Sequence, residues 1–145
     1  MSQRPIRTMI AGRPLVTASS DTTVAAAARL MKKKNVGALL ILEHDGGLAG
    51  IFTERDALFR VMAEGRDPKE TRLSEVMTRH PRTIEPDHPF GHALLMMYDG
   101  GFRHVPVVED GRPIGVVSAR DALGPELQEF DSEIERRTRI QEILG

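Results

Sequence analysis

Two short stretches of the sequence place a hydroxyl side chain three residues before a carboxylate. Thr53 precedes Asp56 in GIFTERDAL, and Ser118 precedes Asp121 in GVVSARDAL. Each hydroxyl residue ends an apolar run, which is typical of a strand that leads into a helix. The free N–H groups at a helix start favour an anion, and a carboxylate can accept both hydroxyl hydrogens of a ribose. The two motifs therefore predict binding of a sugar or a phosphate.

A capping box would use the same spacing, with each side chain bonded back to the backbone at the helix start. Capping is common at helix starts, so one copy of the motif alone favours the cap. Two copies in the same sequence context favour a binding role instead. The two roles are also compatible, because the hydroxyl can cap while the carboxylate points outward.

The same residues give little support to an enzyme. Asp56 and Asp121 belong to different halves of the sequence, so they are expected in separate clefts and not as acid and base across one bond. No nucleophile lies beside a base, and no glycine-rich phosphate loop with its lysine follows a strand. We therefore predict a protein without catalytic residues and without an obligatory cofactor.

The two motifs end two copies of a longer sequence unit. One constant offset aligns four pairs of residues, Thr17 with Thr83, Asp21 with Asp87, Ala27 with Ala93 and Met31 with Met97. The offset drops by one in the turn, EHDGGLAG against EDGRPIG, where an insertion costs least. Two copies indicate an internal repeat by duplication rather than a solenoid.

Within each unit the hydrophobic period changes in the same order. In the first unit Asp21 is a good N-cap for a helix over TVAAAARLMKKK, which Asn35 and Gly37 end. VGALLIL then reads as a buried strand, and Asp45-Gly46 and Asp110-Gly111 predict hairpins. We therefore predict an α+β fold in which two β-α-β-β-α units bury their sheets against each other.

Composition bounds the class of protein. A chain of 145 residues can bury roughly two thirds of its unfolded surface in one compact domain. The net charge of −1 argues against nucleic acid or an anionic membrane as a partner. The chain has no cysteine, which excludes disulfides and thiolate sites, and no apolar run long enough for a signal peptide or membrane span. We predict a soluble, cytoplasmic protein.

Three regions are expected along the chain. Residues 1–64 hold the first repeat with an N-terminal lead-in, 65–124 the connector and second repeat, and 125–145 a C-terminal helical tail. Three apolar residues of the lead-in can pack on the module, namely Ile6, Met9 and Ile10. The tail carries a partial apolar stripe that Arg137 and Gln141 interrupt, so it could cap the domain or meet a partner.

This duplicated order resembles a tandem pair of CBS domains, or Bateman module, over about residues 6–124. The resemblance is carried by GIFTERD and GVVSARD, the strands NVGALLIL and FRHVPVV, the DG hairpins, and VMTRHPRTIEPD at the entry to the second unit. It implies a stand-alone CBS protein with two units packed about a pseudo-two-fold axis. It also implies a regulatory module that holds AMP, ADP, ATP, S-adenosylmethionine or NAD in clefts between the repeats, commonly as a disc-shaped homodimer.

By this resemblance, one cleft holds Ser118 and Asp121 and borrows its adenine-facing wall from the first repeat. The residues expected in that wall are Val16, Thr17, Val36, Gly37 and Ala38. A Gly-Ala step would let a flat purine approach the backbone. Arg103 and His104 match family positions that reach toward phosphate, while a surface arginine and a histidine satisfied by a backbone carbonyl stay open as alternatives.

The related cleft at Thr53 and Asp56 would have a bulkier wall. Its expected residues are Thr83, Ile84, Phe102, Arg103 and His104. We therefore expect unequal sites, with the Asp121 cleft the better nucleotide site. Ligand would change the packing of the repeats or of the dimer, and a regulated protein partner would read that change. The rival function is a ligand-free scaffold or dimerisation protein with vestigial pockets.

Two further groups of residues are candidate sites. Lys32, Lys33 and Lys34 close a helix, which favours a solvated face over phosphate binding. His88 and His92 are spaced for one helical face, but Pro89 and Gly91 lie between them and no third ligand is fixed. We predict no metal site.

Overall fold

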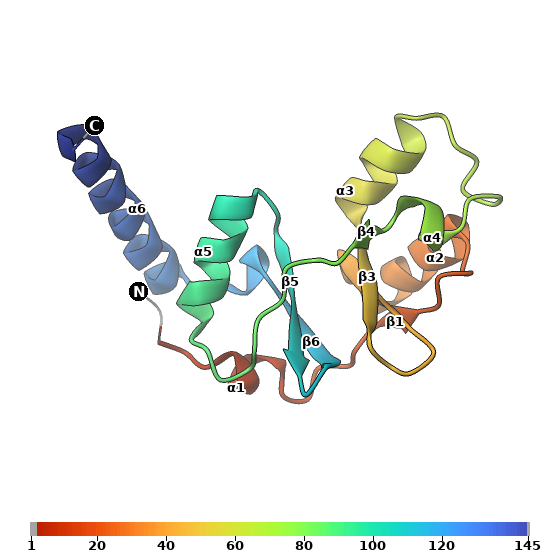
Figure 1. Cartoon of the computed structure of the whole chain (residues 1–145), viewed down its shortest axis with the longest axis horizontal. Helices are drawn as coiled ribbons and strands as arrows, with labels where there is room; N and C mark the ends of the chain where they lie inside the picture. The colour runs from red at the N-terminus through yellow and green to blue at the C-terminus, as the bar shows by residue number, and fades with distance from the viewer. Residues whose placement is uncertain (1–2, 145) are drawn as a thin grey trace.

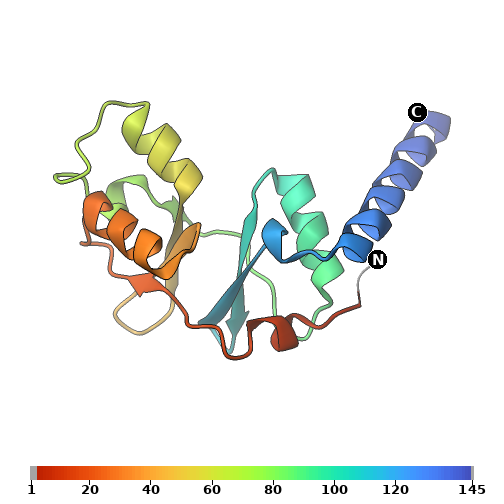
Figure 2. The ribbon, with the colours of Figure 1, turned by 180° about the vertical axis from the view of Figure 1, so that it is seen from behind.

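The computed structural model describes residues 3–144 and has two halves, each with a small inner sheet and outer helices (Figures 1 and 2). The first half holds β1 (Thr17–Ala18), α2 (Val24–Lys34), β2 (Ala38–Leu42), β3 (Leu48–Thr53), α3 (Glu54–Asp56), the π-helical η1 (Ala57–Met62), α4 (Leu73–Val76) and β4 (Thr78–Arg79). The second half holds α1 (Ile6–Ile10), α5 (Phe90–Gly100), β5 (His104–Glu109), β6 (Arg112–Ser118), the 3₁₀ turn η2 (Ala119–Asp121) and α6 (Gly124–Leu144).

The first repeat is built on a four-stranded sheet in the order β1-β2-β3-β4. β1 runs parallel to β2, and the other pairs are antiparallel. Leu39 and Ile41 of β2 pack in the core beneath α2. Leu40 faces the other way, where it packs with Ile51 of the first repeat and Val116 of the second. Burial on both faces explains why this strand is an unbroken apolar run.

The second repeat has a two-stranded β5–β6 sheet, and Ile84 bridges in parallel to Val107 as β1 does to β2. Its core also takes in α1, whose Ile6, Met9 and Ile10 are all buried there. Gly115 permits this contact, because a Cβ at that position would lie 2.9 Å from Ile10. The lead-in thus precedes the first repeat in sequence but packs in the core of the second.

The predicted α+β pair of repeats is confirmed. Two local predictions concern α2, and the one for its start is wrong while the one for its end is correct. Asp21 as the cap of α2 is wrong: Thr23 accepts from the N–H of Ala26 at 3.2 Å, and the helix begins at Val24. The helix ends as predicted, at Asn35 in the left-handed region, with φ of 54°. Thr23 wins because its side chain lies immediately before the first helical residue, where an N-cap must be.

The two hairpins differ in length. Asp110 and Gly111 alone join β5 to β6, and both have the positive φ of a type I′ turn. The β2–β3 connection is longer, with the N–H of Glu43 bonded to the carbonyl of Gly47 at 2.7 Å. Among residues 3–144, no helix has both the length and the apolar character that a membrane span requires.

Candidate functional site

Two cavities lie between the repeats, and each contains one of the duplicated aspartates. The Asp56 cleft has a volume of about 490 Å³ and is lined by Ile51, Thr53, Glu54, Arg55, Asp56, Phe59, Arg60, Thr78, His80, Pro81, Arg82, Phe102, Arg103 and His104. The Asp121 cleft has about 450 Å³ and is lined by Arg13, Pro14, Leu15, Val16, Lys34, Asn35, Val36, Gly37, Ala38, His104, Gly115, Val116, Ser118, Arg120 and Asp121. Each cleft therefore draws on both repeats.

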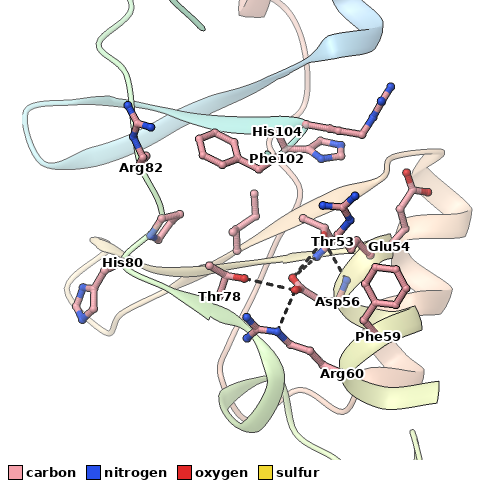
Figure 3. Close-up of a pocket in the computed structure, with 14 residues that line it drawn as sticks. Thr53, Glu54, Asp56, Phe59, Arg60, Thr78, His80, Arg82, Phe102 and His104 are labelled. Atoms are coloured by element: carbon pink, nitrogen blue, oxygen red, sulfur yellow. Dashed lines mark hydrogen bonds and ion pairs between the residues drawn. The ribbon is translucent and has the colours of Figure 1, made fainter. Parts of the chain in front are cut away.

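Asp56 is held at the end of β3 by a reciprocal cap (Figure 3). Its Oδ2 accepts from the N–H of Thr53 at 3.0 Å and from the Thr53 hydroxyl at 3.2 Å. The N–H of Asp56 donates in turn to the Thr53 Oγ1 at 3.2 Å. The capping interpretation of this motif is therefore confirmed.

The second oxygen of Asp56 is turned toward the cleft. Its Oδ1 accepts from the Thr78 hydroxyl at 3.4 Å and lies 3.5 Å from the Nε of Arg60 (Figure 3). Asp56 is 7% exposed, so little of this carboxylate meets solvent. A ligand here would have to share Oδ1 with both groups.

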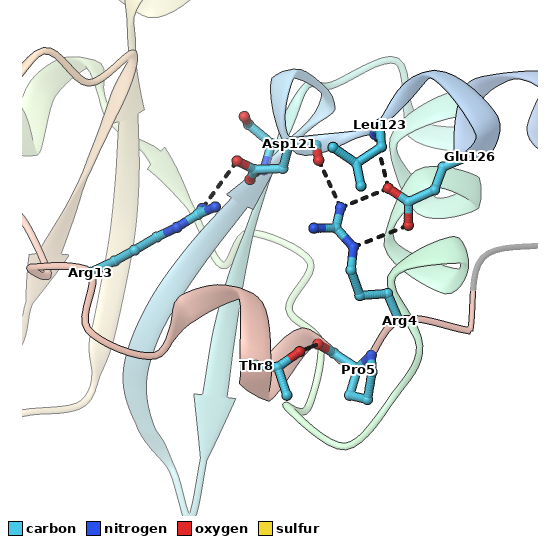
Figure 4. Close-up of polar contacts among 8 residues, drawn as sticks. Arg4, Pro5, Thr8, Arg13, Asp121, Leu123 and Glu126 are labelled. Carbon is cyan, nitrogen blue, oxygen red and sulfur yellow. Dashed lines mark hydrogen bonds and ion pairs between the residues drawn. The ribbon is translucent and has the colours of Figure 1, made fainter.

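Asp121 divides its two oxygens in the same way. Its Oδ2 accepts from the N–H of Ser118 at 2.8 Å, at the end of β6. Its Oδ1 lies 3.0 Å from the Nη1 of Arg13, which reaches across from the segment between α1 and β1 (Figure 4). The Asp121 side chain keeps 17% exposure, more than the 10% of Asp56, so Asp121 is the more accessible of the two.

The structure places most predicted wall residues in the expected cleft. Val16, Val36, Gly37 and Ala38 line the Asp121 cleft with Ser118. Thr17, the first residue of β1, pairs with Leu40 and does not line the cleft.

Arg103 and His104, the pair expected to reach toward phosphate, are split between the clefts. His104 lines both, but Arg103 lines only the Asp56 cleft. Phe102 lines that cleft as expected, whereas Thr83 and Ile84 do not. Ile84 is instead buried in the core of the second repeat, and the chain from His80 to Arg82 takes its place along the cleft.

Several lining residues were missed by sequence reasoning. Arg60 follows Asp56 by one helical turn, a spacing that could have revealed the contact. Arg13 is more than a hundred residues from Asp121 along the chain, and no local sequence pattern predicts their contact. Lys34 was expected on a solvated face; its side chain is exposed, and it also borders the Asp121 cleft.

His104 stands where the two clefts meet. Burial lowers the pKa of its imidazole below the usual value, and the Arg103 and Arg120 charges add to this, while Glu54 and Asp121 oppose it. A Cβ on Gly37 would lie 3.0 Å from the Glu54 Oε1 and 3.2 Å from the His104 Nε2. Glycine at this position therefore lets groups from both repeats approach one another.

The histidine pair forms a separate feature on the surface. His88 and His92 bring their Nδ1 atoms to 3.3 Å. No set of three or more His, Asp or Glu side chains suited to a metal occurs in the described part of the chain.

Comparison with known proteins identifies the family to which this architecture is similar. A family model described as the CBS domain matches residues 6–63 and 73–124. The Arabidopsis thaliana "CBS domain-containing protein CBSX3, mitochondrial" is 35% identical over 81% of this chain, which spans 59% of that relative.

Two solved structures are similar in fold. The CBS domain protein PAE2072 from Pyrobaculum aerophilum, complexed with AMP, is 25% identical with a TM-score of 0.77, over 88% of this chain and 98% of that one. The CBS domain pair of protein MJ0100, in complex with 5′-methylthioadenosine and S-adenosyl-L-methionine, is 30% identical with a TM-score of 0.71, over 81% and 90%.

Proposed function

Because the chain belongs to the CBS-domain family and carries two CBS domains in tandem, we propose that it is a regulatory module that binds an adenosine-containing ligand between its repeats. The observation that carries this proposal is that the two carboxylate oxygens of Asp56, and likewise those of Asp121, have different partners. In each, the backbone fixes one carboxylate oxygen and the other faces a cleft. A fixed carboxylate is a ready acceptor for the two hydroxyls of a ribose.

The size and walls of the clefts support a nucleoside. Volumes of about 490 and 450 Å³ fall within the range of roughly 300–1,000 Å³ typical of small-molecule sites. The small residues Gly37 and Ala38 line the Asp121 cleft, and the aromatic rings of Phe59 and Phe102 line the Asp56 cleft, where a purine can contact them. The AMP, methylthioadenosine and S-adenosylmethionine complexes of the two similar structures point to the same ligand class.

The proposed output is regulatory and not catalytic. A ligand that contacts both repeats favours one relative packing by its differential affinity for the two arrangements. A homodimer mate or a regulated protein partner would read that change. The cytoplasmic location stays a prediction.

Substitution of the two aspartates tests the proposal. Asn keeps the shape of Asp and one carbonyl oxygen for the cap, but it lacks the charge and one acceptor. We expect Asp121→Asn to weaken AMP or ATP binding about tenfold in calorimetric titration, and Asp56→Asn to have a smaller effect. Asp131→Asn, on the exposed side of α6, is the matched control and should bind as wild type.

Two results would contradict the proposal in different ways. If AMP, ADP, ATP and S-adenosylmethionine all leave the thermal midpoint of the wild type unchanged, the chain is a ligand-free scaffold. If the double Asp→Asn variant binds with undiminished affinity, the carboxylates do not hold the sugar. A nucleotide located only beside Asp56 in a soaked crystal would overturn the preference for the Asp121 cleft.

A further inference from the structure

Arg13 occupies the carboxylate oxygen that the proposed function assigns to the ribose. Its Nη1 lies 3.0 Å from the Oδ1 of Asp121, and this is the oxygen not used by the cap (Figure 4). Arg13 belongs to neither sequence repeat, since it lies on the segment that joins α1 to β1. A sugar can therefore reach Asp121 only if Arg13 moves or shares the oxygen.

The ion pair is weak enough for Arg13 to exchange Asp121 for another anionic partner. The side chain of Arg13 is 44% exposed, and pairs with this much solvent contact are held weakly. A phosphate offers the guanidinium two parallel charge-assisted hydrogen bonds, which a single contact with Asp121 does not. A phosphorylated ligand would thus give Arg13 a better partner than the one it leaves.

The remaining charges around the Asp121 cleft favour the same class of ligand. Its lining includes three permanent cations, Arg13, Lys34 and Arg120, but Asp121 as its one acid. Among residues 3–144, the side chains of Lys34 and Arg120 have no hydrogen-bond or ion-pair partner. Cations without partners at the edge of a cleft attract an anion and repel a cation.

We propose that Arg13 is a specificity residue that selects phosphorylated adenosine compounds in the Asp121 cleft, an inference that rests on the proposed function. In the unliganded cleft its guanidinium neutralises Asp121. When a nucleotide enters, the guanidinium passes to the phosphate and leaves Oδ1 to the ribose hydroxyls. Unphosphorylated adenosine must break the ion pair without this exchange, and the sulfonium ligand S-adenosylmethionine brings a positive charge to a cationic cleft.

Arg13→Gln tests the exchange because it should change the affinities for two ligands in opposite directions. We expect the variant to bind AMP about tenfold more weakly, since a charge-assisted contact is lost. We expect it to bind adenosine about two- to fivefold more tightly, since Asp121 is released from an exposed ion pair. Calorimetric titration of AMP and adenosine into both proteins measures the two shifts.

A control substitution at another arginine, and a test of Arg13→Gln in a variant that lacks the carboxylate, show whether the effects are specific to the Arg13–Asp121 pair. Arg66 forms an ion pair with Glu75 at 2.6 Å, has 37% side-chain exposure and lies outside both cleft linings. Arg66→Gln should leave both affinities as in wild type. In an Asp121→Asn background, Arg13→Gln should no longer improve adenosine binding, because no carboxylate remains to be released.

The outcomes separate this inference from the function on which it rests. If the wild type binds neither AMP nor adenosine, the proposed function fails. If the wild type binds AMP but Arg13→Gln leaves both affinities unchanged, or moves both in the same direction, the role of Arg13 is refuted and the proposed function stands. Opposite shifts for AMP and adenosine, with the gain in adenosine affinity lost in the Asp121→Asn background, establish the exchange.

Discussion

Each cleft carboxylate serves the fold with one oxygen and the cavity with the other. The oxygen that caps the turn after the strand fixes the position of the acid, and the second lies beside an arginine, Arg60 or Arg13. These arginines differ in origin. Arg60 is one turn further along the same helical segment, whereas Arg13 comes from outside the repeat. The duplicated motif thus supplies equivalent acids, and unduplicated sequence makes the two clefts different.

His104 gives the folded state a dependence on pH. Burial, the largest cause, lowers its pKa below the ordinary histidine value of about 6.5. The unfolded chain then binds the proton more readily than the folded one. The free energy of unfolding therefore has its full value above that ordinary pKa and falls as the pH decreases through the folded-state pKa.

We expect His104→Gln to remove this dependence. The free energy of unfolding of the wild type, measured in urea, should fall more between pH 7.5 and pH 5 than that of the variant. His44→Gln, in the exposed β2–β3 loop, is the control and should follow the wild-type profile. Equal pH profiles for wild type and His104→Gln would show that this imidazole does not contribute to the pH dependence of stability.

At the scale of elements, α1 acts as part of the second repeat. Ile6 is fully buried, and the N–H groups of Ile6 and Arg7 donate to the carbonyls of His88 and Pro86 at 3.2 and 2.9 Å. Arg7 also contacts Asp87 and Glu109, and these contacts lower the pKa of both carboxyl groups. The segment that carries Arg13 is therefore anchored at its start.

Ile6→Ala measures that anchoring. We expect a loss of about 2–5 kcal/mol in the free energy of unfolding, because the substitution opens a cavity in a closed core. Ile143→Ala, the same substitution at a position 82% exposed, should change it by no more than about 0.5 kcal/mol. If Ile6→Ala is equally mild, α1 is not part of the folded core.

Local pattern predicted the elements well because each repeat changes its hydrophobic period at the same places. The helix that ends at Asn35, the Asp110-Gly111 turn and the strands that end at Thr53 and Ser118 all follow from nearby residues. The sequence pattern could not show that α1 packs in the core of the second repeat, because a short apolar stretch fits either core.

The candidate site was predictable only in part, for the same reason. The capped aspartates and the small residues at Gly37 and Ala38 lie in the repeats, so sequence and family resemblance reach them. Arg13 and the His80–Arg82 segment come to the clefts from the connecting chain. Only the packing of the repeats brings such residues to the site, and no sequence period records it.

At the scale of the whole molecule, two groups of exposed apolar side chains among residues 3–144 are candidates for contact with a second chain. The first is on η1, where Leu58 and Met62 are 49% and 73% exposed. In Figure 1 the helical segment that continues α3 lies on the side opposite the two hairpin turns. The second is on the projecting end of α6, where Ile143 and Leu144 are about as exposed, at 82% and 80%.

The homodimer predicted for the chain can use only one of these surfaces as its main contact, and η1 is the better candidate. Leu58 and Met62 are one helical turn apart on a segment held against the first repeat, so burying them orders few new groups. The end of α6, with Ile140, Ile143 and Leu144, extends beyond the module (Figures 1 and 2), so a contact there must also order the helix end. A contact at η1 therefore has the smaller cost in conformational entropy.

Matched charged substitutions decide between the two surfaces. We expect Met62→Glu to reduce the mass measured by light scattering from twice that of one chain to that of one chain, because a buried unpaired carboxylate is costly. Leu144→Glu should leave the dimer intact. The reverse pattern would move the interface to α6. A wild-type chain that stays monomeric at the concentrations used for ligand titration would contradict the homodimer, and any ligand signal would then have to pass directly to a different protein.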